Sequence, residues 1–368
     1  MKDNKMTIGI FFPKNSEALF NKDCKDTFGG ASVQMYALAK ELNRFTNIST
    51  LSIIPYYSKI NFDDNEKFNF VQLYEPTYGS LKKLIRFLSF IKKYKPNFII
   101  QHGLTVESCY LAFVCKILRI KMIFMFAHDC EVEGLCQTYR TPIRPFKKLL
   151  KNAYLLITQN KYQHRYLVDE YQKLSHIYYN GFEMKNFQKK TVLKKNVLWV
   201  ARCDYWKRPE LFVQLAELNP KLNFTMICPL STDKGLYNKI KRDASKQKNL
   251  TFLSFVPLNK ITKYFEEASV FVNTSDSEGF PQTFLQATIN ANIILSLNVD
   301  PENFIQQYNC GYCCNGNLDI MNEKLREIFA KKSLFMELSQ NAYRYAKENH
   351  DIQINVNKIL KKLNIKGL

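Results

Sequence analysis

The sequence contains no long hydrophobic run. Across its 368 residues no apolar stretch approaches the roughly 18–20 residues that a membrane-spanning helix needs. The first 13 residues hold only a short apolar run and no small residues of the kind found at a cleavage site, so they do not resemble a secretory signal peptide. We therefore expect a cytoplasmic protein.

Paired Cys-x2-Cys clusters are also missing, although the chain has ten cysteines. Cys310, Cys313 and Cys314 come closest to such a cluster, but no second cluster follows them. Zinc sites of this type need four ligands, commonly from two such pairs. The sequence therefore predicts no metal site, and we expect buried free thiols in a reducing compartment.

Acidic residues are few relative to basic ones. The chain has 33 Asp and Glu against 53 Lys and Arg, and its formal charge is +20 at pH 7. This excess favours an anionic partner such as membrane lipid, nucleic acid or a phosphorylated substrate. Part of it is the lysine-rich composition that a low-GC genome produces. A nucleic-acid partner is disfavoured, because the basic residues are dispersed and no recognition module appears.

The sequence is rich in alternating strand and helix patterns. Its length and its 46% hydrophobic content suffice for two α/β domains, and the alternation predicts doubly wound, largely parallel sheets. Strands are expected at 7–12, 48–54, 68–73, 98–101, 121–126, 155–157, 176–179, 197–201, 223–228, 251–254, 268–273 and 292–296. Helices are expected at 29–42, 81–93, 106–118, 161–171, 209–216, 283–289, 318–329, 334–349 and 351–363.

A polar, lysine-rich stretch at 182–196 follows the turn signal Asn180-Gly181, and we interpret it as the interdomain linker. This predicts an N-terminal Rossmann-like domain of residues 1–182 and a C-terminal one of residues 183–350. The last helix, within 351–368, is expected to complete the first domain.

A strand, a loop and a helix near residue 280 predict an anion site. Pro281 occupies the position of a first helical residue, so the free N–H groups of the helix point back toward the carboxyl end of the strand. Glu278 lies in the loop, and Gln286 lies one to two turns into the helix. A carboxylate and an amide would thus flank a bound diphosphate and reach sugar hydroxyls. The alternative is a plain strand-loop-helix unit with a surface glutamate.

This block, Ser275-Asp-Ser-Glu-Gly-Phe-Pro-Gln-Thr-Phe-Leu-Gln-Ala287, resembles the Glu-x7-Glu signature of retaining glycosyltransferases of the GT-B fold, in the glycogen-synthase-like family 4. In that family the first acid contacts the donor sugar and the second contacts the nucleotide ribose. Glu278 matches the first position and Gln286 the second, where a neutral amide hydrogen-bonds more weakly than a carboxylate. The resemblance also implies nucleotide-sugar contacts from the residues between them, Gly279, Phe280, Pro281, Gln282 and Thr283.

Arg202 and Lys207 carry the resemblance further. They flank a loop between an expected strand and the helix that Pro209 opens. In the family an arginine and a lysine at these places bind the nucleotide's phosphates. GT-B enzymes generally use no bound metal, so the resemblance implies that these cations and helix N-termini neutralise the leaving diphosphate.

The N-terminal domain offers weaker motifs. Gly29 and Gly30 let a backbone approach closely at a helix start, and in the family such a loop closes over the donor diphosphate; an ordinary helix start is the alternative. His128 and Asp129 follow a strand, and a comparable histidine in the family contacts the donor sugar near the reaction centre. Asp129 would orient that ring or bind acceptor hydroxyls. A structurally satisfied histidine is the alternative for His128 and is preferred for His102.

The resemblance implies two facing Rossmann-like domains with an interdomain cleft. It also implies metal-independent, retaining transfer of a sugar from a nucleotide sugar, UDP-sugar by preference, to a glycan or lipid-linked hydroxyl. Bacterial surface polysaccharide synthesis is the expected setting, and no cofactor is implied. His128 and Glu278 would be the catalytic pair. The alternatives are a non-catalytic nucleotide-sugar-binding subunit and a GT-B-fold epimerase, for which no convincing pair of acid/base carboxylates is apparent.

Two basic segments predict peripheral contact with an anionic membrane. Residues 79–95 form an amphipathic basic helix pattern, and residues 140–151 form a second basic cluster. Each basic residue near an anionic bilayer contributes about 1 kcal/mol. The protein would then lie at the inner face of the plasma membrane. A solvated basic face over a sheet-packing side is the alternative.

Overall fold

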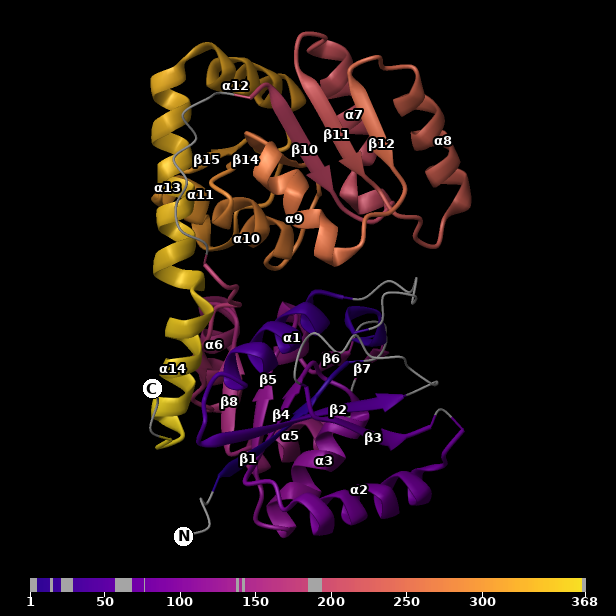
Figure 1. The fold of residues 1–368 in the computed structure, drawn as a ribbon, viewed down its shortest axis with the longest axis vertical. Helices are drawn as coiled ribbons and strands as arrows, with labels where there is room; N and C mark the ends of the chain where they lie inside the picture. The colour runs from indigo at the N-terminus through magenta and orange to yellow at the C-terminus, as the bar shows by residue number, and fades with distance from the viewer. Residues whose placement is uncertain are drawn as a thin grey trace. The chain divides into compact units, whose positions relative to one another are not determined.

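The computed structural model describes residues 5–13, 16–20, 29–56, 68–75, 77–136, 139–140, 143–184 and 194–365. The chain divides into two compact units, each of which is an α/β structure (Figure 1). The first unit comprises Met1–Glu183 and Asp351–Leu368, and the second comprises Met184–His350. Most of the expected linker, residues 185–193, lies outside the described ranges.

A parallel sheet forms the centre of the first unit. Its strand order is β3-β2-β1-β4-β5-β8-β9, so the order reverses between β1 and β4. Each of these strands pairs in parallel with its neighbours. Their bounds are Met6–Phe11 (β1), Ile48–Tyr56 (β2), Phe70–Tyr74 (β3), Phe98–His102 (β4), Lys121–Met125 (β5), Leu155–Thr158 (β8) and His176–Ile177 (β9).

Helices cover both faces of this sheet, which is why its strands are apolar on both sides. One core joins the sheet to α1 (Gly30–Leu42) and α14 (Ile352–Lys362). A second core joins the opposite face to α2 (Ser80–Tyr94), α3 (Val106–Ile117) and α5 (Ile143–Asn152). Figure 1 shows α1 on one side of the sheet and α2 and α3 on the other. The unit is completed by η1 (Ser16–Leu19), α4 (Asp129–Val132), α6 (Lys161–Tyr171) and the hairpin of β6 (Leu135–Cys136) and β7 (Tyr139–Arg140).

Gly181 allows α14 to approach the body of the first unit. A Cβ at this position would lie 2.9 Å from the Cα of Ile352, closer than real Cβ atoms come. Beside it Phe182 forms a parallel bridge with Asp351, and the N–H of Ile352 donates to the carbonyl of Phe182 at 3.1 Å. Gly181 therefore serves the close packing of α14, and no turn is assigned at Asn180-Gly181, where the sequence predicted one.

The second unit repeats this plan with strand order β12-β11-β10-β13-β14-β15, which reverses between β10 and β13. All neighbouring strands again run parallel. The strands are Asn196–Val200 (β10), Asn223–Ile227 (β11), Leu250–Leu253 (β12), Val270–Asn273 (β13), Ile293–Ser296 (β14) and Gly311–Cys313 (β15). The helices are η2 (Tyr205–Lys207), α7 (Pro209–Leu218), α8 (Lys234–Ser245), α9 (Leu258–Glu267), α10 (Gln282–Ile289), η3 (Pro301–Asn303), α11 (Phe304–Gln307), α12 (Leu318–Ala330) and α13 (Lys332–His350).

The predicted doubly wound, parallel α/β class is confirmed, with local corrections. Helices α8 and α9 and strand β15 were not expected from the sequence. Pro281 is the N-cap of α10 and not its first helical residue, with φ −63° and ψ 122°. Among the helices in the described ranges, none has both the length and the apolarity to cross a bilayer.

Candidate functional site

A polar cluster of the second unit lies at its strand-order reversal. The loop after β10 runs through η2 to α7, and the loop after β13 runs to α10. In open parallel sheets, ligands bind beyond the carboxyl ends of the strands at such a reversal. Lys207 comes from the first loop and Glu278 from the second.

Lys207 and Glu278 meet in this cluster. The Nζ of Lys207 lies 2.5 Å from Oε2 of Glu278, and the two side chains are only 15% and 17% exposed. The other carboxylate oxygen, Oε1, accepts hydrogen bonds from Nδ2 of Asn273 at 2.8 Å and from Oγ of Ser275 at 2.6 Å. The carboxylate is thus held by one cation and two neutral donors.

Buried hydrogen bonds join the two loops behind this ion pair. The indole Nε1 of Trp199 donates to Oγ1 of Thr274 at 2.9 Å, and that hydroxyl donates to the carbonyl of Lys207 at 2.6 Å. The N–H of Asp276 donates to the carbonyl of Trp206 at 2.8 Å. These contacts fix the backbone that carries the lysine against the backbone that carries the glutamate, so their geometry is preorganised.

The start of α10 leaves its first N–H groups without a side-chain cap. Gly279 is exposed beside this helix end, while Gln282, Thr283 and Gln286 are half-buried. An uncapped helix start favours an anion, and this one follows the loop whose Glu278 contacts Lys207.

Phe280 does not belong to this polar surface. Its ring packs 5.9 Å from that of Phe304 and 5.2 Å from that of His350, measured between centroids. Its side chain therefore belongs to the core, and a ligand contact from this position would come from the backbone.

Arg202 is not joined to the Lys207–Glu278 pair by any contact between the described residues. Its side chain is 57% exposed, and its Nε lies 3.7 Å from Oδ2 of the buried Asp204. The structure thus brings together two of the three charged residues that the sequence singled out in this unit.

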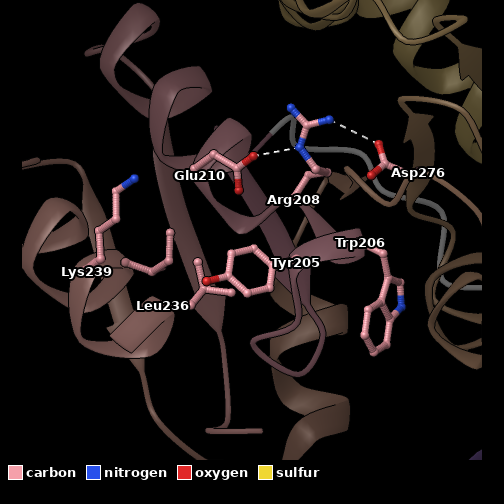
Figure 2. Close-up of a pocket in the computed structure, with 8 residues that line it drawn as sticks. Tyr205, Trp206, Arg208, Glu210, Leu236, Lys239 and Asp276 are labelled. Atoms are coloured by element: carbon pink, nitrogen blue, oxygen red, sulfur yellow. Dashed lines mark hydrogen bonds and ion pairs between the residues drawn. The ribbon is translucent and has the colours of Figure 1, made fainter. Parts of the chain in front are cut away.

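A pocket of about 580 Å³ lies beside the same two loops. In Figure 2 Arg208 lies between Glu210 and Asp276, and Trp206 points away from Tyr205. Arg208 donates from Nε to Glu210 at 2.6 Å and from Nη1 to Asp276 at 3.1 Å. The sequence interpretation missed this pocket. It is lined by Tyr205, Trp206, Arg208, Glu210, Leu236, Lys239, Ile240 and Asp276.

The first unit has a comparable set of polar residues at its strand ends. Gly29 is the N-cap of α1 and Gly30 its first residue, and no side chain caps this end. His102 ends β4, at the strand-order reversal, and is buried. Its Nε2 lies 2.8 Å from Nε2 of Gln159, whose amide also donates to the carbonyl of Phe126 at 2.7 Å. Burial lowers the pKa of His102 to about 4, so this is a neutral structural histidine, as the sequence favoured.

His128 and Asp129 lie at the edge where β5 ends. His128 is exposed and is the N-cap of α4. Although His128 is exposed as a whole residue, surrounding protein atoms partly desolvate its ring and lower its pKa, and the Asp129 carboxylate opposes the shift, so the ring is mainly neutral at pH 7. Oδ1 of Asp129 accepts from Asn160 at 2.8 Å and from Gln163 at 2.9 Å. These bonds orient Asp129 toward α6.

Glu131 is a buried acid that the sequence interpretation overlooked. Its Oε2 accepts from the N–H of Ala127 at 2.8 Å, and the N–H groups of Leu104 and His128 also stabilise its charged form. Burial outweighs these donors and raises the pKa of Glu131 to about 7. The carboxyl group therefore links the loop after β4 to the loop that carries His128. Its burial depends on contacts with the loop after β4, which no pattern in the sequence around His128 indicates.

No three His, Cys, Asp or Glu side chains gather into a possible metal site within the described ranges. Chemically, the second unit presents a lysine ammonium, an uncapped helix start and a carboxylate within one small area. The first two can neutralise a diphosphate, and the third can accept hydrogen bonds from hydroxyl groups.

Comparison with known proteins gives a family match over the second unit. A family model described as "Glycosyl transferases group 1" matches residues 182–348. The capsular polysaccharide biosynthesis glycosyltransferase CapH of Staphylococcus aureus is 25% identical over 137 residues, an alignment that covers 35% of this chain and 38% of that relative. The chain thus matches well under half of this curated relative's length.

Two solved structures illustrate the likeness in fold. Sucrose-phosphate synthase from Thermosynechococcus elongatus superposes with a TM-score of 0.73 at 15% identity, over 98% of this chain and 99% of that one. UDP-GlcNAc 2-epimerase from Neisseria meningitidis, bound to UDP-GlcNAc, gives 0.64 at 11% identity, over 97% and 99%. Identities this low show the fold alone, and the two names describe different activities.

Proposed function

We propose that this chain, which has the GT-B fold and carries a group 1 glycosyltransferase domain at residues 182–348, is a retaining, metal-independent glycosyltransferase. It would transfer a sugar from a nucleoside diphosphate sugar, UDP-sugar by preference, to a hydroxyl group of a glycan or lipid-linked acceptor. Synthesis of a bacterial surface polysaccharide is the setting that the name of the CapH relative supports.

The observation that carries the proposal is the 2.5 Å pair of Lys207 and Glu278 at the sheet's reversal point. In the absence of a ligand each group neutralises the other. An arriving diphosphate offers Lys207 a stronger anionic partner, and Glu278 is then released to accept hydrogen bonds from the donor sugar. The two largely buried charges therefore compensate each other before the donor binds.

The same residues account for the departure of the leaving group. When the glycosidic bond breaks, negative charge grows on the diphosphate, and Lys207 and the N–H groups at the start of α10 stabilise it. Arg202 would supply a second cation from its exposed position, and Gln286 would contact the ribose. Gly279 to Thr283 would line the diphosphate through their backbone.

For the first unit we propose supporting contacts. Gly29 and Gly30 would approach the donor diphosphate, His128 the sugar near the anomeric carbon, and Asp129 the acceptor. A neutral His128 can exchange hydrogen bonds with sugar hydroxyls without adding charge near the bond that breaks.

A nucleotide-sugar epimerase is the second candidate, favoured by the likeness to UDP-GlcNAc 2-epimerase. Glu131 is a carboxyl group with a pKa near 7, as acid/base chemistry requires, but it is 5% exposed and hydrogen-bonded to backbone N–H groups. A non-catalytic subunit that only binds nucleotide sugar is the third candidate.

Incubation of the whole protein with individual UDP-, GDP- and ADP-sugars separates these candidates. A transferase slowly hydrolyses its donor, so we expect free nucleoside diphosphate from one sugar nucleotide, lost in Glu278→Ala and in Lys207→Ala. Lys263→Ala, at an exposed lysine of α9, is the matched control and should release it normally. An epimerised donor would support the epimerase. Thermal stabilisation without release would support the binding subunit, and unchanged release in both site variants would reject the proposed site.

A further inference from the structure

Large apolar side chains are exposed on one helical layer of the first unit. On α2, Leu81, Leu84, Ile85 and Leu88 are all exposed, Leu81 to 73%. Their spacing of i, i+3, i+4 and i+7 places them on one stripe of the helix. The helix buries a different stripe, through Phe87 and Phe90. The exposed stripe is therefore not needed to hold α2 on the sheet.

Helix α3 has the same construction. It buries Cys109, Ala112 and Cys115 against the sheet. It exposes Tyr110, Phe113 and Ile117, at i, i+3 and i+7, with Tyr110 61% exposed. Helix α5 adds Ile143 at its first position, also exposed. Solvent-facing apolar stripes on neighbouring helices indicate an interaction surface.

Basic residues surround these stripes. Helix α2 carries Lys82, Lys83, Arg86, Lys92 and Lys93 and no acidic residue, and α5 carries Arg144, Lys147, Lys148 and Lys151 and no acidic residue. Helix α3 has one residue of each sign, Glu107 and Lys116. Glu107 lies 3.9 Å from Lys83 of α2, and Lys148 of α5 lies 5.7 Å from the ring centroid of Phe113.

The opposite layer of the same sheet differs. Helix α1 exposes no large apolar side chain within its described residues, and α14 exposes only Ile354 among its own. Both layers belong to one protein with one composition. The exposed apolar stripes of α2 and α3 are therefore a local feature and not a consequence of overall hydrophobicity.

We propose that the exposed surface of α2, α3 and α5 docks on an anionic lipid bilayer. Leucine, isoleucine and aromatic side chains would enter the boundary between headgroups and acyl chains, and the lysine and arginine heads would reach the phosphates. A second copy of the chain fits this surface poorly, because two such faces would repel. Nucleic acid would leave the aliphatic stripe of α2 without a counterpart.

Relative to the two basic segments recognised in the sequence, the fold adds α3 as the third contributor. Its aromatic residues provide the amphipathic anchors that prefer the interfacial region. The surface shares no residue with the Lys207–Glu278 pair, so lipid docking and sugar transfer can be tested with different variants.

Vesicle flotation of the whole protein tests this surface. With vesicles of phosphatidylcholine and phosphatidylglycerol in equal parts the wild type should float, and it should remain behind with phosphatidylcholine alone or at high salt. The double variants Leu84→Ser/Ile85→Ser and Phe113→Ser/Ile117→Ser should each weaken partitioning by roughly tenfold or more. Arg86→Glu/Lys92→Glu should weaken partitioning to a similar extent, because it replaces two positive charges with negative ones next to anionic lipid. These positions are exposed, so thermal unfolding should remain as in the wild type.

Matched controls lie on the opposite layer and elsewhere on the unit's surface. Ile354→Ser, Leu174→Ser and Lys358→Glu/Lys361→Glu should leave flotation unchanged. Nucleoside diphosphate release from a sugar nucleotide in lipid-free buffer should be equal in all surface variants. The proposal is overturned if the wild type does not float with anionic vesicles. It is likewise overturned if the α2 and α3 variants float to the same extent as the control variants. It is also overturned if lipid-free wild type is a dimer that the same variants convert to monomer.

Discussion

The two units place a carboxylate at the ends of their central strands in opposite ways. In the second unit Glu278 faces an ammonium group, with Lys207 Nζ 2.5 Å away. In the first unit Glu131 is held by backbone N–H groups, and no cation lies against it among the described residues. The first arrangement can exchange partners when an anion arrives, whereas the second can only gain or lose a proton.

This difference indicates that the two carboxylates have different roles. A charge pair that can exchange partners is suited to binding a diphosphate, because the ligand replaces one member of the pair. A carboxyl group held by amides is suited to fixing loop geometry, here that of the segment bearing His128. Neutralising substitutions at the two carboxylates should therefore have different effects, on activity for Glu278 and on pH-dependent stability for Glu131.

The largest effect is expected where the exchangeable pair is broken. Lys207→Met and Glu278→Gln should each slow nucleoside diphosphate release by roughly 100-fold or more, since each removes a charge used in the transition state. Each should also lower the free energy of unfolding by roughly 1–3 kcal/mol, because a largely buried charge loses its partner. The double variant should regain most of the stability but none of the activity. Release rates and urea denaturation of the four proteins measure this cycle.

Additive stability losses in that cycle would mean that Lys207 and Glu278 do not act as a pair. The double variant should release nucleoside diphosphate no more slowly than either single variant, because the effects of residues that act together do not add. Full activity in either single variant would remove the pair from the reaction altogether.

A smaller effect is expected at Glu131, and it should depend on pH. The folded pKa of about 7 lies above the ordinary value of 4.5, so the folded state binds more protons than the unfolded state between these values. Stability from this group is therefore fully present below about pH 4.5 and is lost as the pH rises to about 7. Glu131→Gln abolishes the titration.

Thermal unfolding of wild type and Glu131→Gln at pH 5, 6, 7 and 8 checks this. The wild type should lose stability relative to the variant as the pH rises, by roughly 3 kcal/mol at most. A constant difference between wild type and Glu131→Gln across the series would mean that Glu131 is charged throughout.

The smallest effect is expected at Gln286. A carboxylate hydrogen-bonds a ribose diol more strongly than an amide, so Gln286→Glu should tighten nucleoside diphosphate binding by roughly tenfold at most. Gln214→Glu, on the exposed face of α7, is the matched control. Equal affinities in calorimetry for Gln286→Glu and wild type would show that residue 286 does not touch the nucleotide.

The fold class was predictable because apolar strands alternate with amphipathic helices along most of the chain. Strands such as β13 and β14, which are buried throughout, show clearly as short apolar runs. Helix α8 was missed because only Leu236, Ile240 and Ala244 are buried among many polar residues. Strand β15 was missed because three residues leave no measurable period.

The site was predictable only in part, since spacing identifies residues but not their contacts. The sequence singled out Lys207 and Glu278, yet it could not show that Trp199 and Thr274 tie their loops together. Nor could it show that Phe280 turns into the core, or that Glu131 is buried. Each of these depends on contacts between segments that are distant in sequence or on burial, which single-sequence patterns do not encode.

Calorimetric titration with a nucleoside diphosphate, comparing wild type with Lys207→Met, tests the central claim most directly. The base would be chosen by a thermal-shift screen of UDP, GDP and ADP. If an exchangeable lysine neutralises the diphosphate, the wild type binds and the variant binds at least about tenfold more weakly. Equal affinity in the two proteins, or no binding of any nucleoside diphosphate by the wild type, would contradict the account.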